Sequence, residues 1–527
     1  MSMATQGLPS RKFALASKWK VLLSVIFGLF MVFLDSTVVN VAFPTLRREF
    51  DASLAESQWV ISTYVLALGI STPLAGFLAD RFGIKRVYLG GLATFVFGSL
   101  MCGIAPNLGL LIAARTLQGL GGGIALPLGA PQLFRAFPAR EQGVALGFFG
   151  IAVAVAPALG LILGGWMIDH QLWRWIFFIN LPIGILGVAL GSRFLQDWRS
   201  ERTPRLDLLG LVTSVIGFGS VLYAASIAEA SGWTSPAVLL WFGIGAIGLI
   251  AFTIIELFVA KEPLLDLRLF RQRTFLLASL VGFVSVVALF AAEFLLPIYL
   301  QSLRGRTALE TGLILLPLAG ALGIGMPLAG RIYDRTGPRP LLIIGFGLLL
   351  VNTWQLSQLQ ADTPIGWIML LMALRGLAGG LTVQTTFVTA LSVVPQRLLP
   401  RGSSLVNSTR QVVQAIAVAA LATVLVSTLS PAVRQAQAQA QEAQHVSSAP
   451  PPGLCEPIPT AATTQPSSDA LALRQQACAE NIVGFERTYQ LTFYAALIAL
   501  GLGALLPGWP FAWAGRRAAD APAAAAH

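Results

Sequence analysis

Residues 76–86 of this 527-residue chain read GFLADRFGIKR, a charged, glycine-bounded loop between two long apolar runs. The same G-x-x-x-D-R-x-G pattern returns at residues 330–339, which read GRIYDRTGPR and again lie between apolar runs. The two copies start 254 positions apart. An internal repeat in an apolar chain predicts two similar membrane-embedded halves, an arrangement typical of transporters.

The composition indicates an integral membrane protein. Hydrophobic residues make up 55% of the chain and charged residues only 11%, against about 25% charged residues in soluble domains. The net charge of +11 is explained by Lys and Arg in cytoplasmic loops, so we expect no nucleic-acid partner. Three cysteines, three histidines and the absence of a G-x-x-x-x-G-K-S/T loop leave little for a metal cluster or nucleotide site. We therefore expect a transporter in the lipid bilayer, not an enzyme, without a cofactor and driven by an ion gradient.

Fourteen apolar runs are long enough to cross about 30 Å of hydrocarbon. They lie near residues 20–41, 57–78, 87–105, 109–133, 143–167, 175–195, 207–228, 236–258, 275–300, 309–332, 340–359, 365–392, 404–428 and 487–509. With both termini in the cytoplasm, about three times as many Lys and Arg fall inside as outside. This bias favours an even number of spans with both tails cytoplasmic.

The repeat also predicts the domain organisation. Arg115 and Arg375 occupy corresponding spans, but the second charged loop follows the tenth run, where two six-span halves would place it after the eighth. Two extra spans therefore separate the halves. The predicted parts are a tail at 1–19, a six-helix bundle at 20–195, a linker with two extra helices at 196–258, a second bundle at 259–509 with an external loop at 431–485, and a tail at 510–527.

Four motifs in order carry a family resemblance. They read LDSTVVNVAFP at residues 34–44, GFLADRFGIKR at 76–86, RTLQG at 115–119 and APALGLILGG at 156–165. The chain resembles the major facilitator superfamily, specifically its fourteen-helix drug:proton antiporter branch of the EmrB/QacA type. The resemblance implies an all-α fold of two six-helix bundles plus two central helices in the bacterial inner membrane. It also implies multidrug efflux, the proton-coupled export of small amphipathic compounds.

The fifth span carries the motif that the family associates with exporters. Its residues are Pro157, Gly160, Gly164 and Gly165. Glycines allow two helix backbones to approach closely, and a proline permits a bend. Ordinary small-residue packing is the alternative interpretation. Leu161 also departs from the family pattern, which usually has proline at that position.

The charged loops are candidate gates. The resemblance implies that Asp80 meets the positive N-terminus of a helix from the other half and closes the cytoplasmic side, while Arg81 and Arg86 pair with nearby acids. The alternative is a tight turn whose charges only set the topology. The two predicted gating loops comprise Gly76, Asp80, Arg81, Gly83 and Arg86 in the first copy and Gly330, Asp334, Arg335 and Gly337 in the second.

Ionisable side chains inside spans are costly unless they are paired or face water. Asp35 lies in the middle of the first span, Arg115 in the fourth and Glu293 late in the ninth. Low dielectric favours a protonated carboxyl group, so Asp35 or Glu293 is a candidate proton carrier, and Arg115 would help Asp35 to release its proton. The alternatives are that Glu293 faces outside water and that Arg115 reaches the membrane interface.

Several aromatic and polar side chains are candidates for a substrate cavity, although such residues more often face lipid or the protein core. They are Asn40, Trp59, Tyr64, Gln118, Phe149, Phe290 and Phe294. Two acids against three arginines within the spans favour a neutral or anionic substrate over a multiply charged cation.

The external loop at 431–485 combines an Ala/Gln segment that can form a helix with a Pro/Ser/Thr segment expected to be mobile. Cys455 and Cys478 would close a loop of 23 residues if they are bonded in an oxidising compartment. The resemblance adds a periplasmic adaptor and an outer-membrane channel as partners that could dock on this loop.

Two alternatives to drug export remain open. One is the export of an endogenous lipid or metabolite by the same fold. The other is a membrane sensor or scaffold that does not transport, against which the lack of a sizeable soluble output domain counts.

Overall fold

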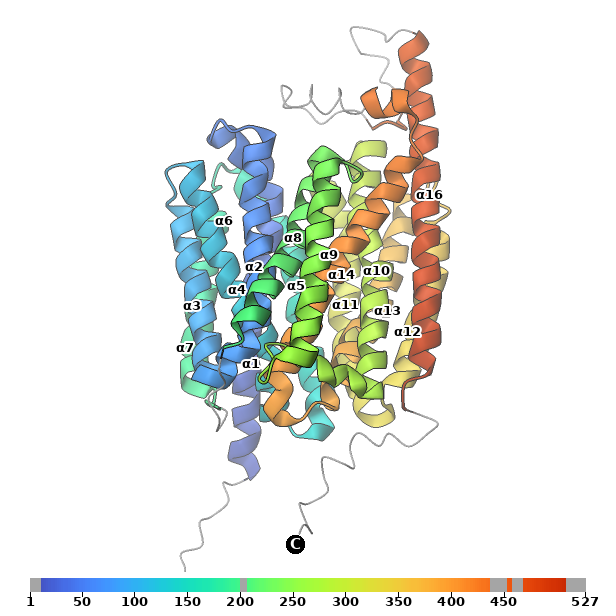
Figure 1. The fold of residues 1–527 in the computed structure, drawn as a ribbon. Coiled ribbons are helices and arrows are strands. Elements are labelled where there is room, and N and C mark those ends of the chain that lie inside the picture. The colour runs from blue at the N-terminus through green and yellow to red at the C-terminus, as the bar shows by residue number, and fades with distance from the viewer. Residues whose placement is uncertain (1–10, 200–205, 437–452, 457–467, 509–527) are drawn as a thin grey trace, which may run out of the picture.

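The computed structural model describes residues 11–199, 206–436, 453–456 and 468–508. These residues form helices and connecting turns, with no strand among them. Twelve helices within this part are long and apolar enough to cross a membrane, and Arg273–Leu289 is a shorter apolar stretch. The predicted all-helical fold is confirmed. The helices lie side by side, with the start of α1 and the end of α16 at the same end of the molecule (Figure 1).

The N-terminal half places six of the predicted apolar runs in helices. Its helices are α1 (Arg11–Glu49), α2 (Leu54–Phe82), α3 (Ile84–Gly103), α4 (Leu108–Ala136), α5 (Gln142–Asp169), the short α6 (Trp175–Phe178) and α7 (Asn180–Phe194). The run at 175–195 comprises α6 and α7, which meet at Ile179, and Trp175–Phe194 is one candidate span, as expected.

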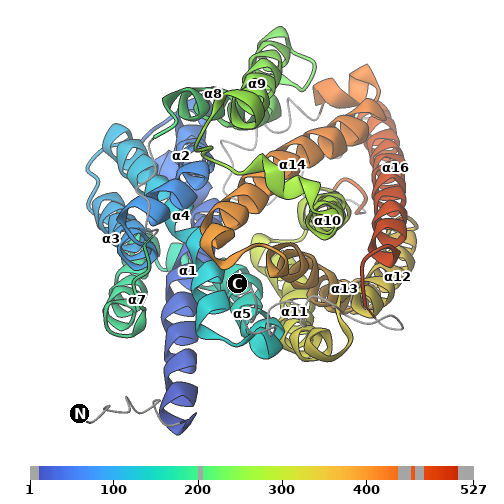
Figure 2. The ribbon, with the colours of Figure 1, turned by 60° about the horizontal axis from the view of Figure 1, so that its bottom comes forward.

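Two helices join the halves. They are α8 (Leu208–Ser231) and α9 (Pro236–Ile254), which pack on each other. We call them the central hairpin. It lies at the edge of the bundle beside α2 and α14 (Figure 2).

The C-terminal half repeats the pattern of the first. Its helices are α10 (Arg273–Ile298), α11 (Ala308–Thr336), α12 (Pro338–Leu356), α13 (Ile365–Ser392), α14 (Leu399–Ser427) and α16 (Ser468–Ala504). Helix α16 begins at Ser468, within the stretch that we assigned to the external loop, so the last part of that stretch is helical. The expected behaviour of residues 437–452 and 457–467, and of the terminal tails at 1–10 and 509–527, lies outside the described part of the chain.

The repeat is visible in how α2 and α11 begin and end. Each starts with a reciprocal capping box, between Ser53 and Glu56 in α2 and between Thr307 and Glu310 in α11. Each ends at a glycine with positive φ, 99° at Gly83 and 79° at Gly337, a backbone conformation that disfavours other residues. We call the end of the bundle that carries these two glycine loops the charged end.

The opposite end carries a disulfide between Cys455 and Cys478. It ties the segment 453–456 to α16. The Leu454 and Cys455 N–H groups donate to the carbonyl oxygens of Ser302 and Leu303 at 2.9 Å, which holds this segment against the turn after α10. The disulfide therefore connects α16 to the end of α10.

We expect an alkylating mass tag to leave Cys455 and Cys478 unmodified as long as no reductant is present, whether the protein is folded or denatured. After reduction, both thiols should react. Cys102 is buried and free, so it adds one tag on denaturation and serves as the internal control. A count of three tags without reductant would contradict the bond.

Candidate proton and gating sites

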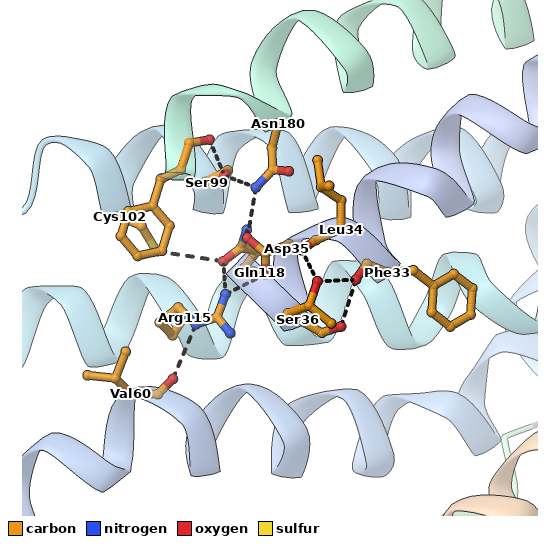
Figure 3. Close-up of polar contacts among 12 residues, drawn as sticks. Phe33, Leu34, Asp35, Ser36, Val60, Ser99, Cys102, Arg115, Gln118 and Asn180 are labelled. Atoms are coloured by element: carbon orange, nitrogen blue, oxygen red, sulfur yellow. Dashed lines mark hydrogen bonds and ion pairs between the residues drawn. The ribbon is translucent and has the colours of Figure 1, made fainter. Parts of the chain in front are cut away.

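A fully buried ion pair of the N-terminal half joins α1 and α4. Arg115 Nη1 lies 2.6 Å from Asp35 Oδ2, and the two side chains are 1% and 0% exposed (Figure 3). A buried charge is tolerated only when it is paired and hydrogen-bonded. The helices that carry Asp35 and Arg115 face each other here, so both candidate residues lie in one site.

Three neutral side chains complete the shell around this pair. Gln118 Nε2 and Asn180 Nδ2 donate to Asp35 Oδ1 at 2.8 and 2.7 Å. Asn180 also donates to Ser99 Oγ at 3.0 Å (Figure 3). The carboxylate of Asp35 therefore receives donors from α4 and α7, and the network extends to α3.

The guanidinium group of Arg115 is held on its other sides. Nη1 donates to Gln118 Oε1 at 2.7 Å, and Nε donates to the Val60 carbonyl of α2 at 3.2 Å. The ring of Tyr64 lies 4.0 Å from the guanidinium carbon, a cation–π distance. Its hydroxyl group is buried without a hydrogen-bond partner among the described residues.

The arrangement ties three helices to one carboxylate. Arg115 donates to Asp35 Oδ2, while Gln118 and Asn180 donate to Oδ1. Because a carboxylate offers about four acceptor positions, these three donors leave one position on Oδ2. The contacts therefore connect α1 to α4 and α7 through a single side chain.

At the charged end, Asp80 of α2 contacts the first turn of α14 in the other half. Arg401 Nε donates to Asp80 Oδ2 at 2.6 Å, and Asp80 is 4% exposed. Gly76 lies one turn earlier, where a Cβ would stand 2.9 Å from the Arg401 Cα atom. The loop thus meets a helix N-terminus of the other half, as expected, and Arg401 is a partner that the sequence did not reveal.

The second copy makes the corresponding contact from the C-terminal half to the N-terminal half. Asp334 of α11 accepts from the Gly143 and Val144 N–H groups at the start of α5, at 3.2 and 3.1 Å. A Cβ at Gly330 would lie 2.1 Å from the Gly143 carbonyl oxygen, so the backbones touch here. Helix N-termini carry partial positive charge, which favours a carboxylate at this place.

The three predicted loop arginines are exposed at the protein surface. Arg86 Nε lies 3.1 Å from Asp197 Oδ2 in an exposed ion pair, and Arg81 lies over the ring of Phe82. Arg335 is exposed. A further contact between the halves runs from Arg135 Nη2 on α4 to the Gln396 carbonyl, at 2.9 Å.

The glycine motif of α5 packs against the helix that carries Asp35. A Cβ at Gly160 would lie 2.0 Å from Thr37 Oγ1, and one at Gly164 would lie 3.3 Å from the Val38 backbone. Gly165 has open space around it, so it does not take part in the close approach. Pro157 lies inside α5, one turn before these contacts.

The candidate cavity residues do not gather in one place. Tyr64 and Gln118 belong to the Asp35 site, Phe149 is buried in the core, and Asn40 is exposed. Trp59 lines a separate open groove of about 530 Å³ between α2 and the central hairpin. The side chains of Glu293, Phe290 and Phe294 lie outside the described part of the structure.

The second half has its own buried arginine at the place that corresponds to Arg115. Arg375 Nη1 donates to Asn352 Oδ1 at 2.9 Å, and Nη2 donates to the Leu289 carbonyl of α10 at 3.0 Å. The two-fold repeat therefore extends from the loops into the polar interior.

Fold and site together define an all-helical, multi-pass membrane transporter built of two related halves. The chain belongs to the Major Facilitator Superfamily, whose sequence pattern matches residues 25–418. The resemblance noted in the sequence is confirmed.

The comparisons include relatives named for drug resistance. The lincomycin resistance protein LmrB of Bacillus subtilis (strain 168) is 30% identical over 77% of this chain and 85% of its own length. The tetracenomycin C resistance and export protein of Streptomyces glaucescens is 32% identical over 78% of this chain and 76% of its own length. The chain is thus a multi-pass protein of the bacterial cytoplasmic membrane in the drug-efflux branch of the family.

A solved structure supports the fold alone. The proton:xylose symporter XylE, bound to a halogenated sugar, superposes with a TM-score of 0.59 at 12% identity. The match covers 94% of this chain and 96% of the symporter.

Proposed function

We propose that this protein is a proton-coupled antiporter that exports small amphipathic or hydrophobic compounds by alternating access. The observation that carries the proposal is the sealed Asp35 site, in which an ionisable carboxylate holds α1, α4 and α7 together. The names of the two relatives, for lincomycin resistance and for tetracenomycin C resistance and export, support a small-molecule cargo.

We infer fourteen membrane spans. Helices α10 and α16 join the twelve long apolar helices, with α6 and α7 taken as one span. The charged end and both tails face the cytoplasm, because Lys and Arg concentrate there. The disulfide end faces the oxidising outer side. Residues 453–456, which the disulfide ties to α16, offer a surface on which a periplasmic adaptor, leading to an outer-membrane channel, could dock.

The state described here is latched at the charged end. Asp80 with Arg401, and Asp334 with the start of α5, join the two halves. Opening toward the cytoplasm breaks both contacts and lets substrate enter. Opening outward gives Asp35 access to the outer side, where it takes up a proton. Proton entry down about 100 mV supplies about 2.3 kcal/mol per charge, which sustains roughly a fifty-fold gradient of a neutral substrate.

We expect Asp80→Asn to cut transport by about tenfold while the protein level stays unchanged. The amide lacks the charge that strengthens the bond to Arg401, and hydrogen bonds to charged groups contribute about 1.5–3 kcal/mol. Substrate efflux is measured in cells that produce equal amounts of each variant. Asp197→Asn, which breaks an exposed pair at the same end, is the matched control and should be nearly neutral. Full activity of Asp80→Asn would remove the latch.

Drug susceptibility tests the function itself. Cells that overproduce the protein should tolerate higher concentrations of lipophilic antibiotics and should expel a fluorescent dye faster than cells with the Asp35→Asn variant. Unchanged tolerance together with no dye efflux would contradict drug export. It would favour export of an endogenous lipid or metabolite, or a sensor or scaffold role.

A further inference from the structure

The segment after the central hairpin passes directly by the latch. Arg401, which bonds Asp80 through Nε, donates through Nη1 to the Pro263 carbonyl at 3.0 Å. We call residues 260–266, which lead from α9 toward α10, the exit segment. Arg401 therefore contacts the N-terminal half and the exit segment from its place at the start of α14. The two extra helices are physically connected to the gate.

A buried carboxylate holds the exit segment in place. Glu256 lies in a π-helical turn, Ile255–Val259, at the end of α9 and is 0% exposed. Its Oε1 atom accepts from the Leu264 N–H at 3.1 Å. Leu264 directly follows Pro263, and its N–H shares a peptide plane with the Pro263 carbonyl, so Glu256 sets the direction in which this carbonyl points.

A second acid approaches Glu256 from the start of α8. A Cβ at Gly210 would lie 2.3 Å from Asp207 Oδ2 and 2.9 Å from Glu256 Oε1, so the two carboxylates lie close together over this glycine. The charged groups that act on Glu256 are Asp207 and Arg401.

We propose that Glu256 is a positioning residue of the latch. It fixes the exit segment so that the Pro263 carbonyl orients Arg401 toward Asp80, and the central hairpin thereby takes part in closing the charged end. This inference rests on the proposed alternating-access function. It adds a third part of the chain to a gate otherwise made by the two halves.

The test measures opening of the charged end without using transport. Ser404→Cys is the reporter, because Ser404 lies one turn after Arg401 on α14 and is 0% exposed. The purified protein in nanodiscs is treated with a water-soluble maleimide, and the labelling rate of the chain without the reporter is subtracted. Closed molecules protect the thiol, so the labelling rate reports the open fraction.

We expect Glu256→Ala to raise the labelling rate by about two- to tenfold, the size typical of losing one buried hydrogen bond. Glu256→Gln keeps one acceptor for the exit segment and should give an intermediate rate, which separates positioning from a general loss of folding. In the Asp80→Asn background, Glu256→Ala should add little, because the latch is already released. Glu480→Ala removes a carboxylate that accepts from the Ser430 N–H at the opposite end, at 2.7 Å, and should leave labelling unchanged.

Two results would overturn the inference and keep the latch. One is a raised rate in Asp80→Asn with a parental rate in both Glu256 variants. The other is a labelling rate in the double variant that rises by the product of the two single increases, which would show that Glu256 acts independently of the latch. A parental rate in Asp80→Asn would instead overturn the latch, and this inference with it.

Discussion

Asp35→Asn should abolish uphill export while leaving the protein folded and able to bind its substrate. Asparagine has nearly the shape of a protonated aspartate but cannot release a proton. Arg115 loses its counter-charge, but it keeps Gln118 Oε1, the Val60 carbonyl and the Tyr64 ring as partners. We therefore expect a lower melting temperature without unfolding.

The measurement separates coupling from binding. Substrate accumulation against its gradient should vanish in liposomes with an imposed pH gradient, whereas exchange of labelled for unlabelled substrate should persist. Asp169→Asn, an exposed acid at the end of α5, is the control and should behave like the parent. Uphill export by Asp35→Asn with parental proton flux would show that Asp35 is not the coupling residue and would leave Glu293 as the candidate.

Arg115→Met should reduce transport at neutral pH by at least about a hundredfold. Breaking a buried ion pair by removing one partner costs about 3–5 kcal/mol, because the remaining charge is left uncompensated. The ionised form of Asp35 is then disfavoured and its proton is harder to release. We expect part of the activity to return as the pH on the cytoplasmic side is raised.

Arg115→Lys is the matched comparison. It keeps the positive charge but not the planar fork that reaches Asp35, Gln118 and the Val60 carbonyl together. Its activity should lie between those of the parent and Arg115→Met, with a smaller change in the pH profile. Equal loss in both variants, without any change in the pH profile, would mean that Arg115 acts only in folding.

The sequence predicted the parts of the site that carry charge. Asp35 and Arg115 are conspicuous because charged residues inside apolar runs are rare, so their pairing could be expected. Asn180 and Ser99 were missed, since neutral polar residues in spans often bond only to their own helix and give no distinct signal. Arg401 looked like one of many cytoplasmic arginines, because nothing local marks it as the partner of Asp80.

Repeats and apolar runs also predicted the helical fold. Features that depend on packing were not predicted. The start of α16 at Ser468 leaves no mark on hydropathy. The aromatic candidates for a cavity were scattered, because an aromatic side chain suits the core, the lipid interface and a binding site equally well.

The most direct measurement of the central claim follows substrate and protons together in liposomes that contain the purified protein. A proton gradient is imposed so that protons flow in the direction opposite to export. Substrate should then move against its own gradient, and protons should move the opposite way at a fixed ratio. Collapsing the proton gradient with an ionophore should stop accumulation at once. Substrate movement that continues unchanged without the gradient, or that shows no opposing proton flux, would contradict proton-coupled antiport.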